Sequence, residues 1–350
     1  MKDSINWGQF WTTFKKTYSI YLVLLALFIV CSFANPNFLS VNNLTNISTQ
    51  LAVTTILAFG QTILIISGML DLSQGSVLAL SGVFAVSAYK STGSFTVAIL
   101  TGIVTGIVCN ILNAVMVSTF KTPPFIATLA MLTMARGVAL LFTEGQNILQ
   151  LGDFTVLGQG KLGFIPIPVL FLIAFAFITW YILRHTRFGR SLYAVGGNEE
   201  AAAASGINVF KVKYMAFIIN GVFVGVAGIL FMSRVNAGLP NGAINYEFTA
   251  LTAAIIGGTS FSGGIGSAGG TLAGAFIVGF LDNIMNLTNV DSYMQQIIRG
   301  AIIALAVIYD IRSKNRRTKS TLGRIEDKSG KSSGGRGSGR KGKQIPGNAK

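Results

Sequence analysis

The chain has 350 residues, of which 51% are hydrophobic and only 11% are charged, and its mean hydropathy is +0.61. This composition excludes a soluble enzyme and indicates an integral membrane protein. Cys31 and Cys109 lie in apolar runs without metal-binding or disulfide spacing, and His185 is the single histidine. We therefore expect neither a metal ion nor another cofactor.

Ten apolar runs are predicted to cross about 30 Å of hydrocarbon. In chain order they cover residues 18–34, 47–67, 75–89, 95–117, 125–142, 166–183, 214–232, 248–257, 270–287 and 295–311. The expected fold class is all-α: a polytopic membrane helical bundle of about ten transmembrane helices with broken or re-entrant segments. The first run has an alternative interpretation as a cleavable signal peptide, because Lys15 and Lys16 precede it and small residues follow it.

Basic residues gather between the runs and predict the orientation of the chain. Lys15, Lys16, the stretch 184–213 and the C-terminal segment should all be cytoplasmic under the positive-inside rule. The short run 248–257 must then count as a crossing. The predicted parts are a cytoplasmic N-terminus (1–17), a transmembrane domain (18–311) and a basic tail (312–350).

The tail holds 13 Lys and Arg against two acidic residues, so about +11 of the net charge of +15 lies there. Its Gly, Ser, Lys and Arg composition predicts a disordered segment that buries no core. Binding of nucleic acid or anionic lipid is one interpretation, and a solvated cytoplasmic extension is the other. We expect the second, and no nucleic-acid partner.

A glycine-rich stretch, GGTSFSGGIGSAGG from Gly257, separates two apolar runs and holds Gly258, Gly263, Gly264 and Gly266. This density predicts a loop or broken helix inside the bundle, where backbone approaches backbone. Non-helical backbone at membrane depth usually borders a solute pathway. The run that ends at residue 67 is also followed by a loop and a helix, which suggests an internal repeat of two related bundles.

Charged residues inside spans cost roughly 2.5 to 3.5 kcal/mol each on insertion scales and therefore need a role. Here they are Asp71, Arg136, Asp282 and Arg299. Asp282 and Asn286 stand one turn apart and should share a helix face. Asp71 precedes the run 75–89 and is expected to cap that helix.

Two further polar or small-residue patterns concern contacts between helices. Asn110 and Asn113 form a polar edge that either joins helices by hydrogen bonds or lines a path. The pairs Gly102 with Gly106, Gly221 with Gly225, and Gly270 with Gly274 have the small-xxx-small spacing of close helix contacts.

The cytoplasmic stretch contains a short predicted helix with strong end signals. Asn198 is a good N-cap, Glu199 and Glu200 suit the first turn, the following alanines favour helix, and Gly206 can end it. A short capped helix that projects from a membrane protein has no core of its own to pack against. It is therefore interpreted as a docking element for a soluble partner.

Four segments together identify a family resemblance: DLSQGSVLAL from Asp71, PPFIATLAMLTMARG from Pro123, TRFGRSLYAVGGNEEAAAASGINV from Thr186, and YEFTALTAAIIGGTSFSGGIGSAGGTLAG from Tyr246. They resemble the membrane permease subunit of ABC importers for monosaccharides of the ribose, galactose and xylose type. The resemblance covers about residues 18–312 and leaves the tail out.

The resemblance implies a bacterial inner-membrane importer with several parts. The expected partners are a cytoplasmic ABC ATPase, an extracytoplasmic sugar-binding protein, a second permease copy in a homodimer, and membrane lipids. The resemblance implies ATPase coupling through Asn198, Glu199, Glu200, Ala201, Ala202 and Gly206. It implies a translocation pathway lined or supported by Asp71, Ser73, Phe125, Arg136, Glu247, Asp282 and Asn286, and the polar edge described above adds Asn113 as a candidate.

Two other functions compete with an ATP-driven importer subunit. The chain has no credible nucleotide-binding motif, so it is not expected to be an enzyme and an ATPase would be another polypeptide. A stand-alone secondary carrier or channel for a small neutral solute is the alternative. An intramembrane enzyme is disfavoured because no nucleophile–base pair or metal cluster is present in the sequence.

Overall fold

The structure, a computed structural model, describes the backbone of residues 7–308, 310 and 312, and side chains from residue 19 onward. The predicted basic tail, 312–350, lies outside the described residues except for its first position. The first helix begins at Trp7. It therefore starts within the segment 1–17 that was predicted to be a separate cytoplasmic N-terminus.

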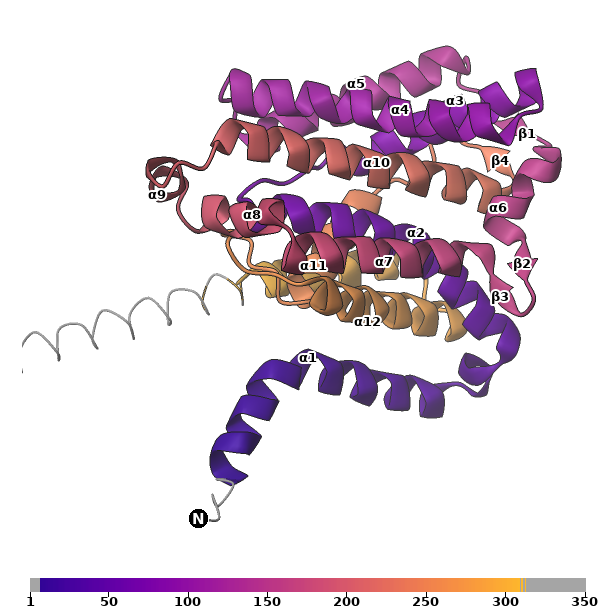
Figure 1. Cartoon of the computed structure of the whole chain (residues 1–350). Helices are drawn as coiled ribbons and strands as arrows, with labels where there is room; N and C mark the ends of the chain where they lie inside the picture. The colour runs from indigo at the N-terminus through magenta and orange to yellow at the C-terminus, as the bar shows by residue number, and fades with distance from the viewer. Residues whose placement is uncertain (1–6, 309, 311, 313–350) are drawn as a thin grey trace, which may run out of the picture. The chain divides into compact units, whose positions relative to one another are not determined.

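The described chain is almost entirely helical (Figure 1). The α-helices are α1 (Trp7–Ala34), α2 (Val41–Ile66), α3 (Gln74–Thr92), α4 (Phe95–Ala114), α5 (Pro124–Phe142), α6 (Val156–Gln159), α7 (Ile167–His185), α8 (Arg187–Gly197), α9 (Glu199–Ala204), α10 (Val209–Val235), α11 (Tyr246–Ile256) and α12 (Ala268–Leu287). A last apolar helix, Ser292–Ile308, follows and is called the terminal helix below. Short 3-10 turns cover Pro36–Leu39 and Gly152–Thr155, and a π-helical turn, Val115–Thr119, ends α4.

Two small antiparallel ladders lie at one end of the bundle. In the first, β1 (Ile148–Leu149) pairs with β4 (Ala237–Gly238), and in the second β2 (Lys161–Leu162) pairs with β3 (Ile165–Pro166). The short helices α8 and α9 lie at the opposite end, on the left of Figure 1. The long helices run between these two ends, so each end collects a different set of loops.

Six helices of the described chain are long and apolar enough to cross a membrane. They are α2, α4 with its π-helical turn, α5, α7, α10 and α12. Three shorter apolar helices are Ser19–Ala34, α11 and the terminal helix. The all-α membrane bundle is thus confirmed, whereas the count of about ten crossings is not. Four expected spans are not among the six. The helices α3 and α11 are largely enclosed by protein, where full apolarity is not needed, and the apolar parts of α1 and of the terminal helix have fewer than 18 described residues.

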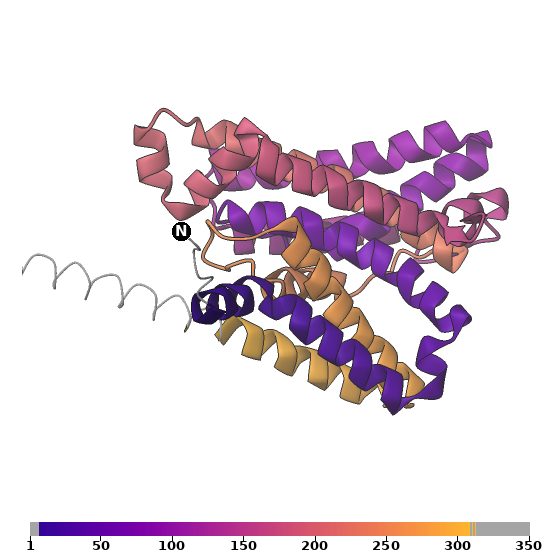
Figure 2. The same cartoon turned by 60° about the horizontal axis from the view of Figure 1, so that its bottom comes forward.

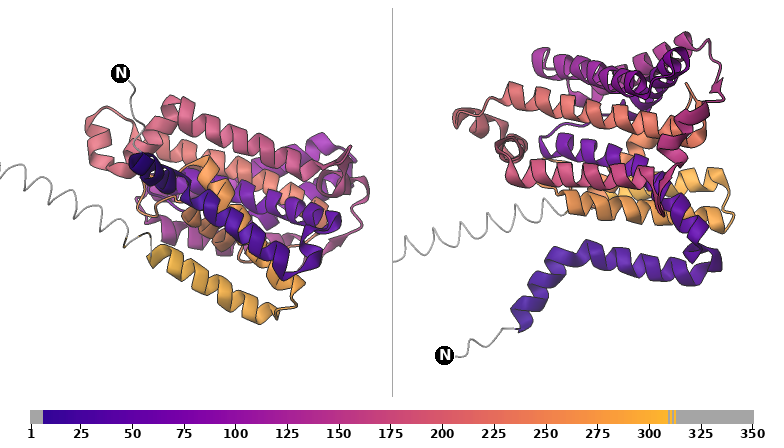
Figure 3. Two further views of the ribbon diagram at one scale, coloured as in Figure 1. Left: turned by 90° about the horizontal axis from the view of Figure 1, so that it is seen from below. Right: turned by 45° about the vertical axis from the view of Figure 1, so that its right-hand side comes forward.

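The centre of the bundle is formed by α2 and α10. In their most apolar windows, 89% and 78% of the residues are buried, compared with 28% for α4 and α5 and 22% for α7. The outer helices expose apolar side chains, as expected for surfaces that face lipid. Figures 2 and 3 show α1 lying along α12, where Phe28 and Phe38 pack on Phe280.

Close glycine contacts join α4 to α10, as the small-xxx-small spacing predicted. A Cβ atom on Gly106 would collide with the carbonyl oxygen of Gly221, and one on Gly225 would meet the carbonyl of Gly102 at 2.7 Å. A similar contact joins α12 to α11, because a Cβ on Gly274 would collide with the carbonyl of Ala253. Glycine at these positions lets the helix backbones touch.

Helices α2 and α11 end in the same way. Gly68 and Gly258 have positive φ angles of 79° and 86°, and each follows a helix end closed by a 6→1 hydrogen bond. These bonds run from Met69 N to Leu64 O and from Thr259 N to Ala254 O, both 3.0 Å. The two loops therefore begin with the same turn at the end of a helix, as their predicted similarity requires. A repeat of whole bundles stays a prediction.

Candidate functional site

Asp71 lies in the connection from α2 to α3 and is fully buried. Its Oδ1 atom accepts hydrogen bonds from the backbone N of Ser73 at 2.7 Å and from the Ser73 hydroxyl. The N-cap residue of α3 is Ser73, so the prediction that Asp71 caps this helix was wrong. The carboxylate binds the cap residue itself, and the Ser73 side chain forms no cap hydrogen bond.

Asn220 on α10 connects Asp71 to two other helices. Its Nδ2 donates to Asp71 Oδ2 at 2.7 Å and to Asn110 Oδ1 at 2.8 Å, while its Oδ1 accepts from Gln74 Nε2 at 2.7 Å. Asn113 donates to Ser73 Oγ at 3.1 Å. These side chains are all fully buried. We call this set the amide network.

The hydrogen bonds of the amide network match the first interpretation of Asn110 and Asn113, whereas a role in lining a path stays a prediction. Both form hydrogen bonds between or within helices, and neither lines a cavity described below. Sequence reasoning missed Asn220, a lone amide in an apolar run, and Gln74, which stands next to Ser73 just before the run 75–89. Within the amide network, Gln74 Oε1 and Asn113 Oδ1 lack a hydrogen-bond partner, and ordered water usually completes such groups.

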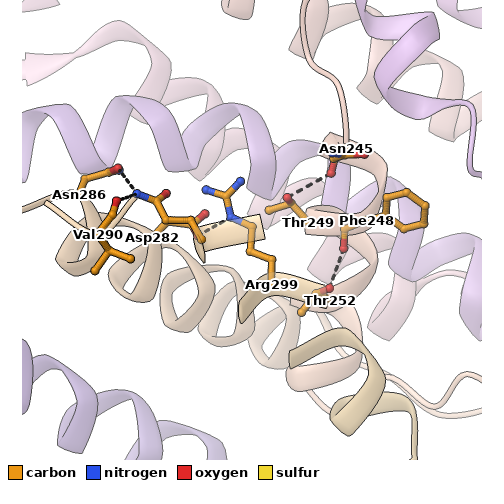
Figure 4. A network of polar contacts seen from close by, with 9 residues as sticks. Asn245, Phe248, Thr249, Thr252, Asp282, Asn286, Val290 and Arg299 are labelled. Carbon is orange, nitrogen blue, oxygen red and sulfur yellow. Dashed lines mark hydrogen bonds and ion pairs between the residues drawn. The ribbon is translucent and has the colours of Figure 1, made fainter. Parts of the chain in front are cut away.

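A cavity of about 340 Å³ lies between α11, α12 and the terminal helix (Figure 4). Asp282 and Arg299 form an ion pair on its wall, with 2.8 Å between Oδ1 and Nε. One turn further along α12, Asn286 Oδ1 accepts from Gln295 Nε2 at 3.0 Å. The predicted shared face of Asp282 and Asn286 therefore faces the terminal helix. The cavity is lined by Asn245, Phe248, Thr249, Thr252, Val278, Leu281, Asp282, Gln296, Arg299, Gly300, Ile302 and Ile303.

A smaller cavity of about 20 Å³ continues this space toward α2. It shares Thr249, Val278 and Asp282 with the larger cavity and adds residues of α2 such as Gln50 and Thr54. Polar groups therefore extend from the terminal helix to the central helix of the bundle. The smaller cavity holds roughly one water molecule, so a solute with several hydroxyl groups fits only in the larger one.

Three other predicted pathway residues lie outside both cavities. Arg136 on α5 donates from Nη1 to the carbonyls of Pro240 at 2.6 Å and Gly242 at 2.8 Å, and so fastens the loop before α11. Glu247 is buried beside Gly75, at the N-terminus of α3, where the helix dipole favours an acidic group. Phe125 is half exposed near the start of α5. The structure does not bring these three together with Asp282.

The predicted docking helix is present as α9, and its end signals act as expected. Asn198 Oδ1 accepts from Ala201 N at 2.8 Å, and Gly206 has a φ angle of 82° just after the helix. Lys213 Nζ donates to both carboxylate oxygens of Glu199 at 2.8 Å. Ala202 is buried, whereas Glu200, Ala201, Ala203 and Ala204 are exposed.

The connection from α11 to α12, residues 257–267, is called the glycine loop below. It packs against α8, and this contact was not predicted. Gly263 and Gly264 lie against the backbone of Gly196, and Gly264 N donates to Ile66 O, at the end of α2, at 2.8 Å. Tyr193 on α8 donates from its hydroxyl to Gly266 O at 2.8 Å. At the start of α12, Gly257 lies against Gly270. The expectation of a loop where backbone meets backbone is therefore confirmed.

Comparison with known proteins places the chain in a transport family. Residues 43–307 match the profile of the family described as branched-chain amino acid transport system / permease component, and the chain belongs to this family. It is a multi-pass membrane protein whose relatives are permease subunits.

Within the family, the chain resembles permeases of monosaccharide importers, as its motifs indicated. It is 39% identical to the ribose import permease protein RbsC of Bacillus subtilis (strain 168) over 83% of this chain and 91% of the relative. The RbsC of Escherichia coli (strain K12) is also 39% identical, over 83% and 92%. The L-arabinose transport system permease protein AraH of Escherichia coli (strain K12) is 33% identical over 91% and 96%.

Proposed function

We propose that this chain is the transmembrane subunit of an ATP-binding cassette importer that moves a monosaccharide, a ribose-like pentose or a hexose, into the cytoplasm. The names of its relatives support import of ribose and arabinose. The observation that carries the proposal is α9, a capped helix that projects from the end of the bundle and buries little of its own surface. Such a projection suits a separate ATPase as the source of work.

The docking surface for the ATPase is α9 with its flanking residues. Asn198 and Gly206 fix the ends of the helix, and the Lys213 ion pair holds Glu199 against α10. The exposed residues Glu200 and Ala201 then present a small, acidic surface of fixed geometry. A rigid projection loses little conformational entropy on docking, which favours binding and transmission of force.

Movement of α9 would reach the transmembrane helices through α8. Tyr193 and Gly196 contact the glycine loop, and this loop bonds to the end of α2 through Gly264. The same loop leads into α12, which carries Asp282 and borders the cavity. Docking and the cavity are therefore linked through close backbone contacts and the Tyr193 hydrogen bond.

The pathway residues fall into three roles in this proposal, with Phe125 outside them. Asp282 and Asn286 border the path of the sugar, whereas Asp71, Ser73 and Asn113 hold the helices around it through the amide network. Arg136 and Glu247 shape the loop and helix at the outer mouth, and Phe125 lies on the outer side of the bundle. A second copy in a homodimer and an extracytoplasmic sugar-binding protein complete the importer.

We infer a topology of ten crossings with both termini in the cytoplasm of a bacterial cell, in its cytoplasmic membrane. The alternation of consecutive long helices between the α9 end and the β-ladder end in Figure 1 supports this topology. In it, α3 and α11 cross together with the adjoining loops at 67–73 and 257–267. Cysteine labelling of Ser205→Cys from the cytoplasmic side only is the expected result.

The proposal is tested by uptake of radiolabelled D-ribose, L-arabinose and D-xylose into proteoliposomes that hold this chain, its ATPase and its binding protein. ATP-dependent uptake of at least one sugar is expected. The double variant Glu199→Lys, Gly206→Pro should insert normally but lose ATPase association and uptake, because proline does not adopt the φ angle of residue 206. Unchanged uptake contradicts the docking role of α9. Uptake driven by an ion gradient, without ATPase or ATP, indicates a secondary carrier instead.

A further inference from the structure

The cavity between α11, α12 and the terminal helix has the size of a small-molecule site. Its volume of about 340 Å³ lies within the usual range for ligand pockets, roughly 300 to 1,000 Å³. It corresponds to about ten water volumes, at roughly 30 Å³ for each water in the liquid. A ligand of roughly ten heavy atoms therefore fits with its hydroxyl groups close to the wall.

The Asp282–Arg299 pair supplies donors and acceptors side by side without net charge. Among the described residues, the one hydrogen bond that joins the pair runs from Arg299 Nε to Asp282 Oδ1. The second carboxylate oxygen and the terminal nitrogens of the guanidinium are left for further hydrogen bonds, and Figure 4 shows these nitrogens pointing away from the carboxylate. Two adjacent hydroxyl groups match this arrangement, because a hydroxyl both donates and accepts.

The other wall of the cavity adds acceptors and one aromatic face. The hydroxyls of Thr249 and Thr252 donate to the carbonyls of Asn245 and Phe248, at 3.3 and 2.7 Å, so their oxygen lone pairs can accept from a ligand. The Phe248 ring is 38% exposed and stands at the same wall. Apolar residues line the rest, which suits the C–H face of a sugar ring.

The charge of the site argues for a neutral ligand. The acidic group and the basic group compensate each other, so neither an anion nor a cation finds an unpaired counter-charge. No group of three potential metal ligands occurs among the described residues. The remaining polar side chains, Asn245, Thr249, Thr252 and Gln296, are neutral as well.

We propose that this cavity binds one neutral monosaccharide within each copy of the chain, with Asp282 and Arg299 at its polar end and Phe248 as a platform for the ring. This inference rests on the proposed function and specifies where the cargo pauses. A bound sugar would hydrogen-bond to the second carboxylate oxygen of Asp282 and to the terminal nitrogens of Arg299, and would leave the Nε–Oδ1 contact in place. It would therefore bridge α12 and the terminal helix.

Cysteine protection in the complete importer tests the site directly. Thr252→Cys places a thiol in the cavity, while the native Cys31 and Cys109 are buried and contribute little background. A small hydrophilic thiol reagent should modify Thr252→Cys, and a saturating amount of the transported sugar should slow this reaction at least threefold. Asn241→Cys, in the exposed loop before α11, should react at the same rate with and without sugar. If Thr252→Cys does not fold, Thr249→Cys takes its place.

Uptake kinetics give a second, independent readout. Phe248→Ala and Thr252→Val should each raise the KM for sugar uptake by the complete importer at least fivefold. The kcat for uptake should change less, because both substitutions remove groups that bind the sugar. Phe177→Ala, a matched change at an exposed ring on α7, should stay within twofold of wild type. Equal labelling with and without sugar, or no labelling at Thr252→Cys and Thr249→Cys, overturns the site. A wild-type importer that takes up none of the three sugars refutes the proposed function instead.

Discussion

Tyr193 on α8 donates a hydrogen bond of 2.8 Å to the carbonyl of Gly266, in the loop that leads into α12. The two residues are 73 positions apart in the chain. Together with the contact of Gly196 on Gly263, this bond fastens the helix next to α9 to the glycine loop. Among the described residues, it is the one side-chain hydrogen bond in this junction between α8 and the glycine loop. Removing the single hydroxyl oxygen tests its role.

Tyr193→Phe removes the phenolic donor and leaves the ring in place. We expect a loss of about 1 kcal/mol in the free energy of unfolding, the usual net value of one hydrogen bond, and a lower amount of sugar imported per ATP hydrolysed. Thermal unfolding in detergent and coupled uptake measure the two effects. Tyr214→Phe, which loses the exposed contact with Thr119, is the matched control and should keep wild-type coupling. If both variants import the same amount of sugar per ATP hydrolysed, the junction between α8 and the glycine loop does not transmit movement from α9.

The pH dependence of the same junction follows from burial of Tyr193. Burial raises the pKa of this phenol above its ordinary value of about 10. Since the unfolded chain ionises first, the stabilisation is complete below about pH 10 and declines as the pH rises toward the folded pKa. Between pH 8 and 11, the melting temperature should therefore fall more steeply for wild type than for Tyr193→Phe. Parallel curves for the two proteins contradict this prediction.

Asn220→Leu should be strongly destabilising, because it leaves the buried Asp71 carboxylate without its amide donor. A loss of about 3 kcal/mol or more is expected, since a buried carboxylate that loses a hydrogen-bond donor costs more than the usual 1 to 3 kcal/mol for a neutral group. The matched control is Asn283→Ala, which breaks a reciprocal amide pair with Asn43 at a half-buried position. That change should cost less than about 1 kcal/mol because water replaces the lost bonds. Equal melting temperatures in detergent for the two variants contradict the prediction.

Gly106→Ala should separate α4 from α10. The new Cβ collides with the carbonyl of Gly221 on the facing helix, and overpacking of this kind typically costs 1 to 3 kcal/mol. Gly137→Ala on α5 has open space around the new Cβ and should be neutral or slightly stabilising, because alanine favours helix. The yield of monodisperse protein and its melting temperature distinguish the two. A lower stability for Gly137→Ala than for Gly106→Ala is the opposite result.

The features that could be predicted from the sequence are those set by local backbone chemistry. The helix α9 has its cap at Asn198 and its end near Gly206 because both signals act within a few residues. The close contacts of Gly106 and Gly225 follow from a spacing that is visible in each helix alone. Asp71 and Ser73 are both good cap residues two positions apart, and local pattern could not decide between them.

The features that could not be predicted join residues that are distant in the chain. Asn220 reaches Asp71 across 149 positions, and Arg299 reaches Asp282 only because the terminal helix returns beside α12. Hydrophobic periodicity does not predict Asn220 as the partner of Asp71 or Arg299 as the partner of Asp282. It identifies the polar face of a helix but not the helix that packs against that face. Hydropathy detects fewer crossings than the ten predicted for a related reason, because α3 and α11 are enclosed by protein and need less apolar surface.

The distance in sequence between Asp71 and Asn220 has a consequence for biosynthesis. At 5 to 20 residues per second, a ribosome needs roughly 7 to 30 seconds to add the residues between them. During that interval the carboxylate of a nascent chain lies in or near the bilayer without its amide. We therefore expect insertion machinery to shelter α2 to α4 until α10 arrives, and truncated products that end before residue 220 to be degraded by quality-control proteases.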